Sequence, residues 1–449
     1  MTTPVKTNNN KTKPTIYLLT GDVGGTNSRM SLYWGRDLGC HCTETDVLVV
    51  KYFRNADYLP AEVLNDPRAF QTRIVSRFLQ YCWTESEAKD TLCPLEQATI
   101  YACLAIAGVV SNNAVHLTNL GGMLVDGNLI QQDNSDPYLK RITACQIIND
   151  FVAQGYGCLT LKPHEVRHLH GPEPPQHMDT FETAFTGPKV CVGAGTGLGE
   201  CYLTPYPTAT GQIKYACFPS EGGHVEFAPR NELEMKLWKY LSEKFTSRHR
   251  ISVERVVSGK GLANVYEFLA HECPERVIPD VHQAFLTAGD EQGKVVGMNA
   301  LNKPSDNLCR QAMGIMISAY GCEVGSAAIK WIPTGGLFVT GGLTPKNIQF
   351  IEGPQSEFML SYANKGRVSP LLDRIPLYAV MVEDLGVRGA HYKASQMLHE
   401  DDETSNMSSL AQEKKKTYMM WALVALGHLA LSITVGFPLL KAWHRRRSQ

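Results

Sequence analysis

The chain alternates between short apolar runs and longer segments with helical periodicity. "TIYLLTGDVGGTNSRMSLYWG" predicts a strand, a glycine turn and a second strand, and "PKVCVGAGTGLGECYLTPY" repeats that pattern in mid-chain. "ATIYACLAIAGVV", "CQIIND" and "GGLFVTGG" predict buried strands, because they are rich in small and branched residues. Strands that alternate with helices are typical of an α/β protein. Two glycine hairpins far apart, each within such a unit, predict two related lobes around one cleft.

Helical segments lie between these strands. In "DPRAFQTRIVSRFLQYCW" the residues Phe70, Ile74, Phe78 and Leu79 fall on one face, which predicts an amphipathic helix. "NELEMKLWKYLSEKF" predicts another, and "DNLCRQAMGIMISAYGCEVGSAAIKW" predicts one or two buried helices. The Pro- and His-rich stretch "LKPHEVRHLHGPEPPQHMD" predicts a surface loop.

These patterns divide the chain into successive regions. We expect a flexible tail over 1–14, a smaller lobe over 15–159 completed by 378–397, a larger lobe over 160–377, a charged linker over 398–416, a transmembrane helix over 417–440 and a basic tip over 441–449.

Composition narrows the class of protein. A chain of 449 residues with 43% hydrophobic residues can form a two-lobed enzyme with a sizeable core. A net charge of −1 gives no electrostatic reason to expect nucleic acid as a partner. The 13 cysteines are scattered without zinc-ligand spacing, so we interpret them as reduced thiols of a cytosolic protein. The first fifteen residues have neither an apolar core nor arginine, so neither a secretory signal nor a transit peptide is expected.

The C-terminal region has a different character. "YMMWALVALGHLALSITVGFPLL", residues 418–440, contains no Asp, Glu, Lys or Arg, and as a helix it would span roughly 34 Å. Lysines precede it and "KAWHRRR" follows it, which predicts a membrane-spanning helix. Only nine residues follow, so we expect a tail anchor with the rest of the chain on the cytosolic side. The mitochondrial outer membrane is the first expectation, peroxisomal and plastid membranes are alternatives, and an apolar helix packed on the enzyme is the other interpretation.

The first glycine loop is "GDVGGTN". Gly24 and Gly25 allow a tight turn whose N–H groups face an anion, and Thr26 and Asn27 add donors. Asp22 could hold a magnesium ion through water. An ordinary hairpin turn is the alternative interpretation of this stretch.

The second glycine loop, "GAGTGLGE", has glycines at alternate positions from 193 to 199. Leu198 and Glu200 occupy the positions where a dinucleotide fingerprint requires glycine, and a strand follows instead of a helix. A hairpin turn whose amides meet phosphate fits this spacing better. "VSGKGL" is not a P-loop, because Glu254 replaces its first glycine and Gly261 its hydroxyl residue.

Polar residues that can transfer a proton or bind a hydroxyl group follow the strands. Asp150, at the end of "IIND", can accept the proton of a hydroxyl that attacks a phosphoryl group, and Asn149 can bind an adjacent hydroxyl. A helix cap is the competing interpretation of this pair. Glu221, His224 and Glu254 stand beside glycines and can bridge sugar hydroxyls, or they belong to a solvated surface. Metal binding by Glu221 and His224 lacks an obvious third ligand.

The order of the motifs is more specific than any one of them. "GDVGGTN", "AIAGVV", "LTN", "IINDFVAQG", "GAGTGLG", "EGGHVEFAP", "ERVVSGKGL" and "GGLFVTGG" resemble, in this order, the bacterial-type glucokinase family over about residues 15–397. The resemblance implies the two-lobed ribonuclease H-like fold of hexokinases, actin and heat-shock chaperones. It also implies ATP- and Mg²⁺-dependent phosphorylation of the 6-hydroxyl of glucose to glucose 6-phosphate, the first step of glycolysis.

The resemblance assigns roles to matching positions. It implies that Asp150 is the general base. The implied sugar ligands are Asn149, Asp150, Glu221, His224, Glu254 and Asn119. The implied ATP ligands are Asp22, Gly24, Gly25, Thr26 and Asn27 in the first phosphate loop, Thr196 and Gly197 in the second, and Gly341 and Gly342 at the adenosine. Without the resemblance, Gly341 and Gly342 could equally mark a bulged strand.

The chain departs from the family pattern at two places. It has "AGVV" where the family often has A-G-P-V, and "SGKGL" where the family often has S-G-P-G-L, so Lys260 adds a charge near the site. A kinase of the same fold that acts on another hexose, such as glucosamine or mannose, and a non-enzymatic glucose sensor on a membrane stay open as alternatives. The resemblance is compatible with a homodimer.

Overall fold

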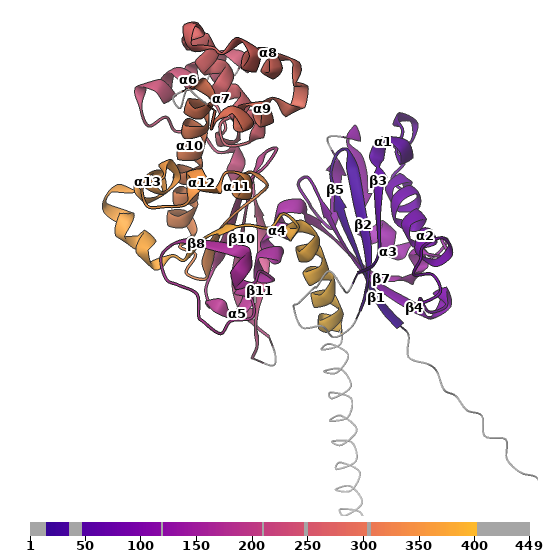
Figure 1. Cartoon of the computed structure of the whole chain (residues 1–449). Helices are drawn as coiled ribbons and strands as arrows, with labels where there is room; N and C mark the ends of the chain where they lie inside the picture. Colours follow the sequence, from indigo (N-terminus) through magenta and orange to yellow (C-terminus); the bar gives the residue numbers. More distant parts are fainter. Residues whose placement is uncertain are drawn as a thin grey trace, which may run out of the picture. The chain divides into compact units, whose positions relative to one another are not determined.

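The computed structural model of the chain describes residues 15–35, 47–117, 120–208, 211–246, 250–302 and 307–401. The described residues as far as Ser395 belong to one compact unit. That unit is built on two mixed sheets, each with its own hydrophobic core (Figure 1).

The first sheet has the strand order β3-β2-β1-β4-β7. Its strands are β1 (Thr15–Val23), β2 (Asn27–Trp34), β3 (Val47–Arg54), β4 (Ala98–Ile106) and β7 (Ile142–Asn149). The predicted strand–turn–strand unit is confirmed, since β1 pairs with β2 antiparallel. β1, β4 and β7 are parallel, with Asp22 opposite Ala105 and Asn149 opposite Ile106. The carboxyl ends of these strands therefore bring Asp22 and Asn149 to one edge of the sheet.

Short helices and a two-stranded ribbon complete this lobe. They are α1 (Asn55–Tyr58), α2 (Arg77–Thr84), α3 (Gly127–Gln132), β5 (Ala114–Leu117) and β6 (Met123–Asp126). Phe70, Ile74, Phe78 and Leu79 are all buried in the core of the lobe, as the periodicity predicts. The π-helix η3 (Gln71–Ser76) leads directly into α2, which the periodicity did not indicate.

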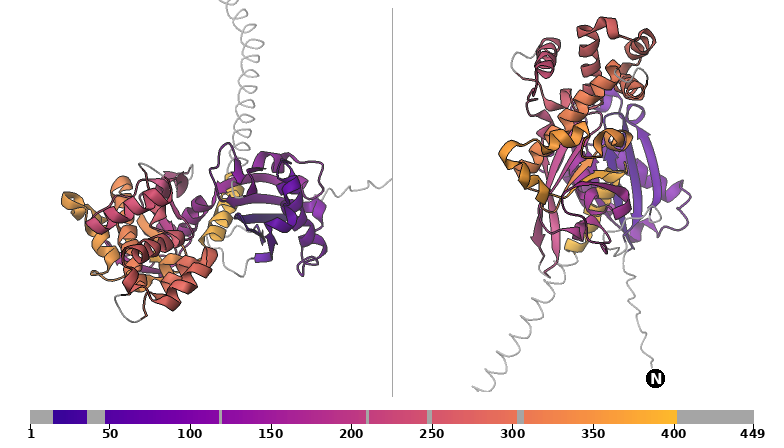
Figure 2. Two further views of the ribbon diagram at one scale, coloured as in Figure 1. Left: turned by 90° about the horizontal axis from the view of Figure 1, so that it is seen from above. Right: turned by 60° about the vertical axis from the view of Figure 1, so that its left-hand side comes forward.

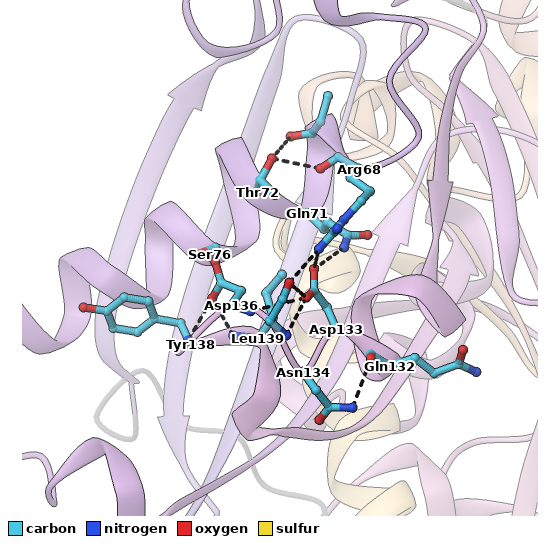
Figure 3. Close-up of polar contacts among 12 residues, drawn as sticks. Arg68, Gln71, Thr72, Ser76, Gln132, Asp133, Asn134, Asp136, Tyr138 and Leu139 are labelled. Carbon is cyan, nitrogen blue, oxygen red and sulfur yellow. Dashed lines mark hydrogen bonds and ion pairs between the residues drawn. The ribbon is translucent and has the colours of Figure 1, made fainter.

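A polar network attaches this helix to the chain segment that follows α3 (Figure 3). Arg68 donates to a carboxylate oxygen of the buried Asp133, and Gln71 Nε2 donates to the same oxygen at 2.8 Å. Ser76 Oγ donates to Asp136 Oδ2 at 2.7 Å. Two carboxylates thus fix the segment that leads into β7, the strand that ends at Asn149.

The second sheet has the strand order β11-β10-β9-β12-β13-β8. Its strands are β8 (Val166–His170), β9 (Lys189–Ala194), β10 (Leu198–Pro207), β11 (Ile213–Ser220), β12 (Gly336–Thr340) and β13 (Leu377–Val380). The second predicted hairpin is confirmed, since β9 pairs with β10 antiparallel.

Two segments of this sheet differ from the sequence expectations. The Pro- and His-rich stretch predicted as a loop contains β8, which pairs antiparallel with β13. The loop prediction was therefore wrong for these residues, because pairing with a distant strand overrides their local composition. The return of the chain was expected to complete the smaller lobe from residue 378, whereas β13 lies in the second sheet.

Helices cover the second sheet and extend beyond it. They are α4 (Asp150–Leu159), α5 (Phe181–Ala184), α6 (Glu232–Lys244), α7 (Gly259–Glu272), α8 (Pro279–Thr287), α9 (Gln292–Asn299), α10 (Leu308–Trp331), α11 (Leu343–Lys346), α12 (Ile348–Ile351) and α13 (Glu357–Ala363). α7, α9 and α13 pack against α10 (Figure 2). The predicted buried segment is thus one helix of 24 residues.

Hydropathy alone does not separate α10 from a membrane helix. Among the described residues, α10 is the helix long and apolar enough to span a bilayer, with a mean hydropathy of 1.3. About two thirds (67%) of its most apolar 18-residue window is buried inside the protein, as expected for a core helix. The transmembrane helix predicted over 417–440, the N-terminal tail, most of the linker and the basic tip lie outside the described residues.

Two helices connect the lobes. α4 packs against β4 and β7 of the first sheet and against β10 and β11 of the second. A helix over residues 385–401 crosses α4 closely, because a Cβ on Gly157 would lie 2.3 Å from the carbonyl oxygen of Leu385, and one on Gly389 would lie 1.7 Å from that of Ala153. The two backbones can approach this closely only where glycine lacks a side chain.

Candidate active site

Asn149 and Asp150 stand where β7 ends and α4 begins. Asn149 Oδ1 caps the helix by accepting from the backbone N–H groups of Phe151 at 2.8 Å and Val152 at 3.1 Å. Its Nδ2 donates to the carbonyl of Gly108 at 3.0 Å. The capping interpretation of Asn149 is therefore realised, and it fixes Asp150 as the first residue of α4.

The carboxylates near this point influence one another. Burial raises the pKa of Asp150, Glu221 raises it further, and hydrogen bonds from the backbone of Phe151 oppose the shift. The residue Asp22 keeps contact with solvent, yet the protein encloses its carboxylate enough that burial, followed by the charge of Asp150, raises its pKa. Three acidic groups thus converge from β1, α4 and the segment after β11. Such a centre favours a bound cation or a proton donor.

The first glycine loop is held by a residue that the sequence analysis missed. Asn55 is fully buried, and its Nδ2 donates to the carbonyls of Gly24 at 2.8 Å and Gly25 at 3.2 Å. Its backbone N–H donates to the carbonyl of Thr26 at 2.8 Å. These bonds hold the loop, and Thr26 and Asn27 in it are exposed. An asparagine directly after a strand was the only available signal for this role.

The four glycines of the second loop have two different functions. The turn is closed by Gly195 N–H, which donates to the carbonyl of Gly197 at 2.8 Å, and Thr196 is exposed at its tip. Gly193 and Gly199 lie opposite each other in β9 and β10. A Cβ on Gly199 would lie 2.2 Å from the ring of Phe151, and one on Gly193 would lie 2.8 Å from it. These two glycines make room for the residue that follows Asp150.

Glu254, one of the predicted sugar ligands, contacts the second loop. It lies in the 3₁₀-helix η9 (Val253–Arg255), and its Oε2 accepts from the backbone N–H of Leu198 at 3.0 Å. A Cβ on Gly197 would lie 2.6 Å from the same oxygen. Glycine at 197 therefore allows the loop to approach the carboxylate. Among the described residues, the other oxygen of Glu254 accepts no hydrogen bond.

Glu221 precedes the 3₁₀-helix η8 (Gly222–His224), and His224 is its last residue. Their side chains are more than half exposed, and His224 Nε2 lies 3.8 Å from Glu221 Oε2. The helix rests on a buried acid, since a Cβ on Gly222 would lie 2.0 Å from Glu200 Oε2. Burial, followed by the charge of Glu323, raises the pKa of Glu200 to about 8. Glu200 is therefore largely neutral at pH 7.

The remaining predicted site residues are placed as follows. Thr196, His224 and Glu254 line one cavity of about 300 Å³. Gly341 has a left-handed φ of 79°, and a Cβ there would lie 2.3 Å from the carbonyl oxygen of Ala194, next to the second loop. Gly342 faces the ion pair of Lys346 and Glu383. Asn119 lies outside the described residues.

The sequence comparisons identify one family. A family model for glucokinase matches residues 19–397. The chain is 36% identical over 390 residues to a glucokinase of Nostoc punctiforme, covering 85% of this chain and 99% of the relative. It is 40% identical over 304 residues to a glucokinase of Synechocystis sp., covering 66% of this chain and 79% of the relative.

Solved structures support the fold. The crystal structure of a glucokinase from Balamuthia mandrillaris in complex with glucose matches with a TM-score of 0.62 at 21% identity, covering 86% of this chain and 95% of that one. A glucokinase from an Antarctic psychrotroph matches with a TM-score of 0.55 at 22% identity, covering 85% and 99%. These likenesses establish a two-lobed α/β fold of the actin-like sugar-kinase type.

The family model spans both lobes, and the similarity to the relative from Nostoc extends over nearly its whole length. The expected order of motifs and the family model point to the same enzymes. The chain therefore belongs to the glucokinase family, the enzymes that transfer a phosphoryl group from ATP to glucose.

Proposed function

We propose that Asp150 is the general base with which this enzyme phosphorylates the 6-hydroxyl of glucose. The position of Asp150 carries the proposal, because it begins α4 at the edge where β1 and β7 end, near Asp22 and Glu221. The sugar oxygen would attack the γ-phosphorus of ATP, its proton would pass to the Asp150 carboxylate, and ADP would leave. Such a transfer depends on position and charge stabilisation, so the base needs no unusual pKa.

The proposed sugar ligands surround this base. Glu221 and His224 present exposed side chains, and Glu254 has a second carboxylate oxygen that accepts no hydrogen bond from the described residues. Asn149 keeps one Nδ2 hydrogen beyond its bond to Gly108, with which it can reach a sugar hydroxyl. Asn119 is proposed as a further ligand from sequence alone. Closure of the lobes on glucose would exclude water and so prevent hydrolysis of ATP.

ATP is proposed to bind between the two glycine loops. The first loop would contribute the backbone and side chains of residues 24–27, and the second would contribute Thr196 and Gly197. Gly341 and Gly342 would lie against the adenosine.

The residues present fit magnesium as the metal of this reaction. Mg²⁺ usually takes one or two carboxylates and fills its shell with water and substrate phosphates, and Asp22 supplies one carboxylate at the sheet edge. In the described part of the chain, no three His, Cys, Asp or Glu side chains form a metal cage. When bound with ATP, Mg²⁺ would neutralise charge on the β- and γ-phosphates.

The substitution Asp150→Asn tests the assignment of the base. Glucose should bind within a few-fold of the wild-type affinity, while kcat falls by about 10²- to 10⁴-fold because the proton acceptor is lost. A coupled assay with ATP and glucose, repeated with mannose and glucosamine, measures both the rate and the sugar preference. Asp90→Asn, in an exposed turn, is the matched control. Near-normal turnover of Asp150→Asn would refute the role of Asp150.

We also propose that residues 418–440 anchor the enzyme in an organelle membrane, with the mitochondrial outer membrane as the first candidate. The support is the length and apolar character of this segment and its basic flanks. Deletion of residues 417–449 should move the protein from the membrane to the soluble fraction with its activity intact. If the truncated chain stays with the membranes, the anchor lies elsewhere. Light scattering on the truncated chain tests the homodimer that the family resemblance favours.

A further inference from the structure

The cavity beside the second glycine loop contains side chains that the proposed mechanism does not use. Its volume is about 300 Å³, and Thr196 and Glu254 form the part of its wall that belongs to the candidate active site. The rest of the wall includes Phe245, Arg255 and Lys260. The cavity is therefore continuous with the proposed sites for phosphate and sugar.

The charge of the lining is mainly positive. Three Arg or Lys side chains line the cavity against one carboxylate, that of Glu254. Arg250 is paired, because its Nε lies 3.2 Å from Glu226 Oε1. Arg255 and Lys260 form no ion pair with any residue in the described ranges. Within the described ranges, these two positive charges thus line a concave surface without a direct ion-pair partner.

One of these cations is held in place. The guanidinium carbon of Arg255 lies 3.5 Å from the centre of the Phe245 ring, a distance suited to cation–π stacking. Asn264 Nδ2 donates to the carbonyl of Arg255 at 3.0 Å and fixes its backbone. A stacked guanidinium is pre-organised, so little conformational entropy is lost when it binds an anion.

One of the hydroxyl groups in the cavity wall, that of Ser258, is already engaged. Ser258 Oγ donates to the carbonyl of Glu254 at 2.8 Å and accepts from the backbone N–H of Gly261 at the same distance. This hydroxyl is therefore not available to a ligand, whereas Arg255 and Lys260 are. A compact oxyanion fits this chemistry better than a neutral sugar does, because Arg and Lys bind phosphate through charge-assisted hydrogen bonds.

We propose that this cavity binds a phosphoryl group through Lys260 and Arg255. The proposal rests on the proposed function, because that function brings two phosphorylated molecules to this position. One is the nucleotide, whose phosphate chain would extend past Thr196, and the other is the sugar phosphate product. Both present the same chemistry to the two cations, and the experiment separates them.

Lys260 allows a clean set of variants. It is the second residue of α7, and proline is tolerated in the first turn of a helix because no N–H bond is lost there. Lys260→Pro therefore removes the charge and restores the residue that the family pattern often has. Lys260→Gln removes the charge alone, and Lys260→Arg keeps it.

Equilibrium binding of ADP and of glucose 6-phosphate to the full chain, each measured without turnover, tests the site. Lys260→Gln and Lys260→Pro should weaken the binding of one of the two ligands by about tenfold, equivalent to about 1.4 kcal/mol. The affinity for glucose should stay within about twofold of the wild type. Lys260→Arg should restore the affinity. Lys239→Gln, which removes an exposed charge on α6 outside the cavity, should change the affinity for neither ligand.

The separate measurements with ADP and with glucose 6-phosphate identify which phosphoryl group the cavity binds. Weakened ADP binding assigns the cavity to the nucleotide, and weakened glucose 6-phosphate binding assigns it to the product. If both ligands bind Lys260→Gln and Arg255→Gln as tightly as they bind the wild type, the proposal is overturned. Because no turnover is involved, this result is independent of Asp150→Asn, so failure of the base assignment and failure of the anion site are distinguishable.

Discussion

The ring of Phe151 explains two glycines that a phosphate loop does not require. Gly193 and Gly199 face it from paired strands, while Gly195 and Gly197 form the turn between them. The sequence revealed the turn and excluded a dinucleotide fingerprint, because both follow from local spacing. It could not reveal the packing role, since Phe151 approaches from another part of the chain.

Substitution of Gly199 by alanine is expected to affect both stability and turnover. The new Cβ would lie 2.2 Å from the Phe151 ring, so the ring must move, and Asp150 precedes it. We expect a loss of about 1–3 kcal/mol in the free energy of unfolding, as is typical of an overpacked core, together with a lower kcat. Denaturant titration and the coupled assay measure the two effects.

Gly195→Ala provides the matched control for stability, because a Cβ there meets no atom within 4 Å. Its free energy of unfolding should stay close to that of the wild type. Equal stability and turnover of Gly199→Ala and the wild type would show that the ring moves aside freely, contrary to the packing argument.

Elements were predictable where their pattern was local. The two hairpins, the strand before Asp150 and helix α6 follow from periodicity, and the structure confirms them. β8 could not be foreseen, because its residues Val166–His170 become a strand only by pairing with β13, far along the chain. The π-helix η3 could not be predicted from the sequence either, since a change of helical pitch leaves the apolar face intact. Its first residue, Gln71, is held instead by Asp133, and its last residue, Ser76, by Asp136 (Figure 3).

This network predicts a pH dependence of stability. Burial would raise the pKa of Asp133, but hydrogen bonds from Ser135, Arg68 and Gln71 outweigh burial and hold this pKa well below its usual range. The carboxylate therefore stabilises the fold above its unfolded pKa of about 3.9, and this contribution is lost as the pH falls through the lower folded value.

The substitution Asp133→Asn should lower the free energy of unfolding by about 1–3 kcal/mol at pH 7, because it leaves buried donors poorly paired. The difference from the wild type should shrink as the pH falls below about 4. Denaturant titrations between pH 3 and 7 measure this. A difference that is constant with pH would mean that the ionised carboxylate is not the stabilising species. The exposed Asp90→Asn serves as the control.

At the scale of the whole molecule, the order of motifs predicted the two-lobed fold correctly. Which segments belong to which lobe was harder to predict from the sequence. β13 joins the second sheet, and the helix over 385–401 contacts both lobes. From that helix, the ring of His391 packs edge-on against Tyr33 at 4.5 Å, and Tyr392 stacks on Tyr156 at 5.6 Å. These contacts join residues far apart in the sequence, so no local pattern could indicate them.

Truncation tests the role of this helix. A chain that ends at residue 401 should fold and phosphorylate glucose, whereas one that ends at residue 384 should lose both its stability and its activity. The shorter chain lacks Arg388, whose Nη2 lies 2.7 Å from Glu165 Oε1, and Tyr392, whose hydroxyl donates to Glu182 Oε1 at 2.7 Å. Thermal unfolding and the coupled assay compare the two. Equal melting temperatures would refute a structural role for the helix.

The glycine crossing between this helix and α4 has a mechanical consequence. Gly389 meets the backbone of α4 at Ala153, three residues after Asp150, and Leu385 meets it at Gly157. Backbone against backbone leaves no flexible side chain to absorb a displacement. Tension applied at residue 401 would therefore be expected to reach α4, the helix that begins with the proposed general base Asp150. A fusion partner or surface linkage placed after residue 401 would therefore need a linker long enough to put no load on this helix.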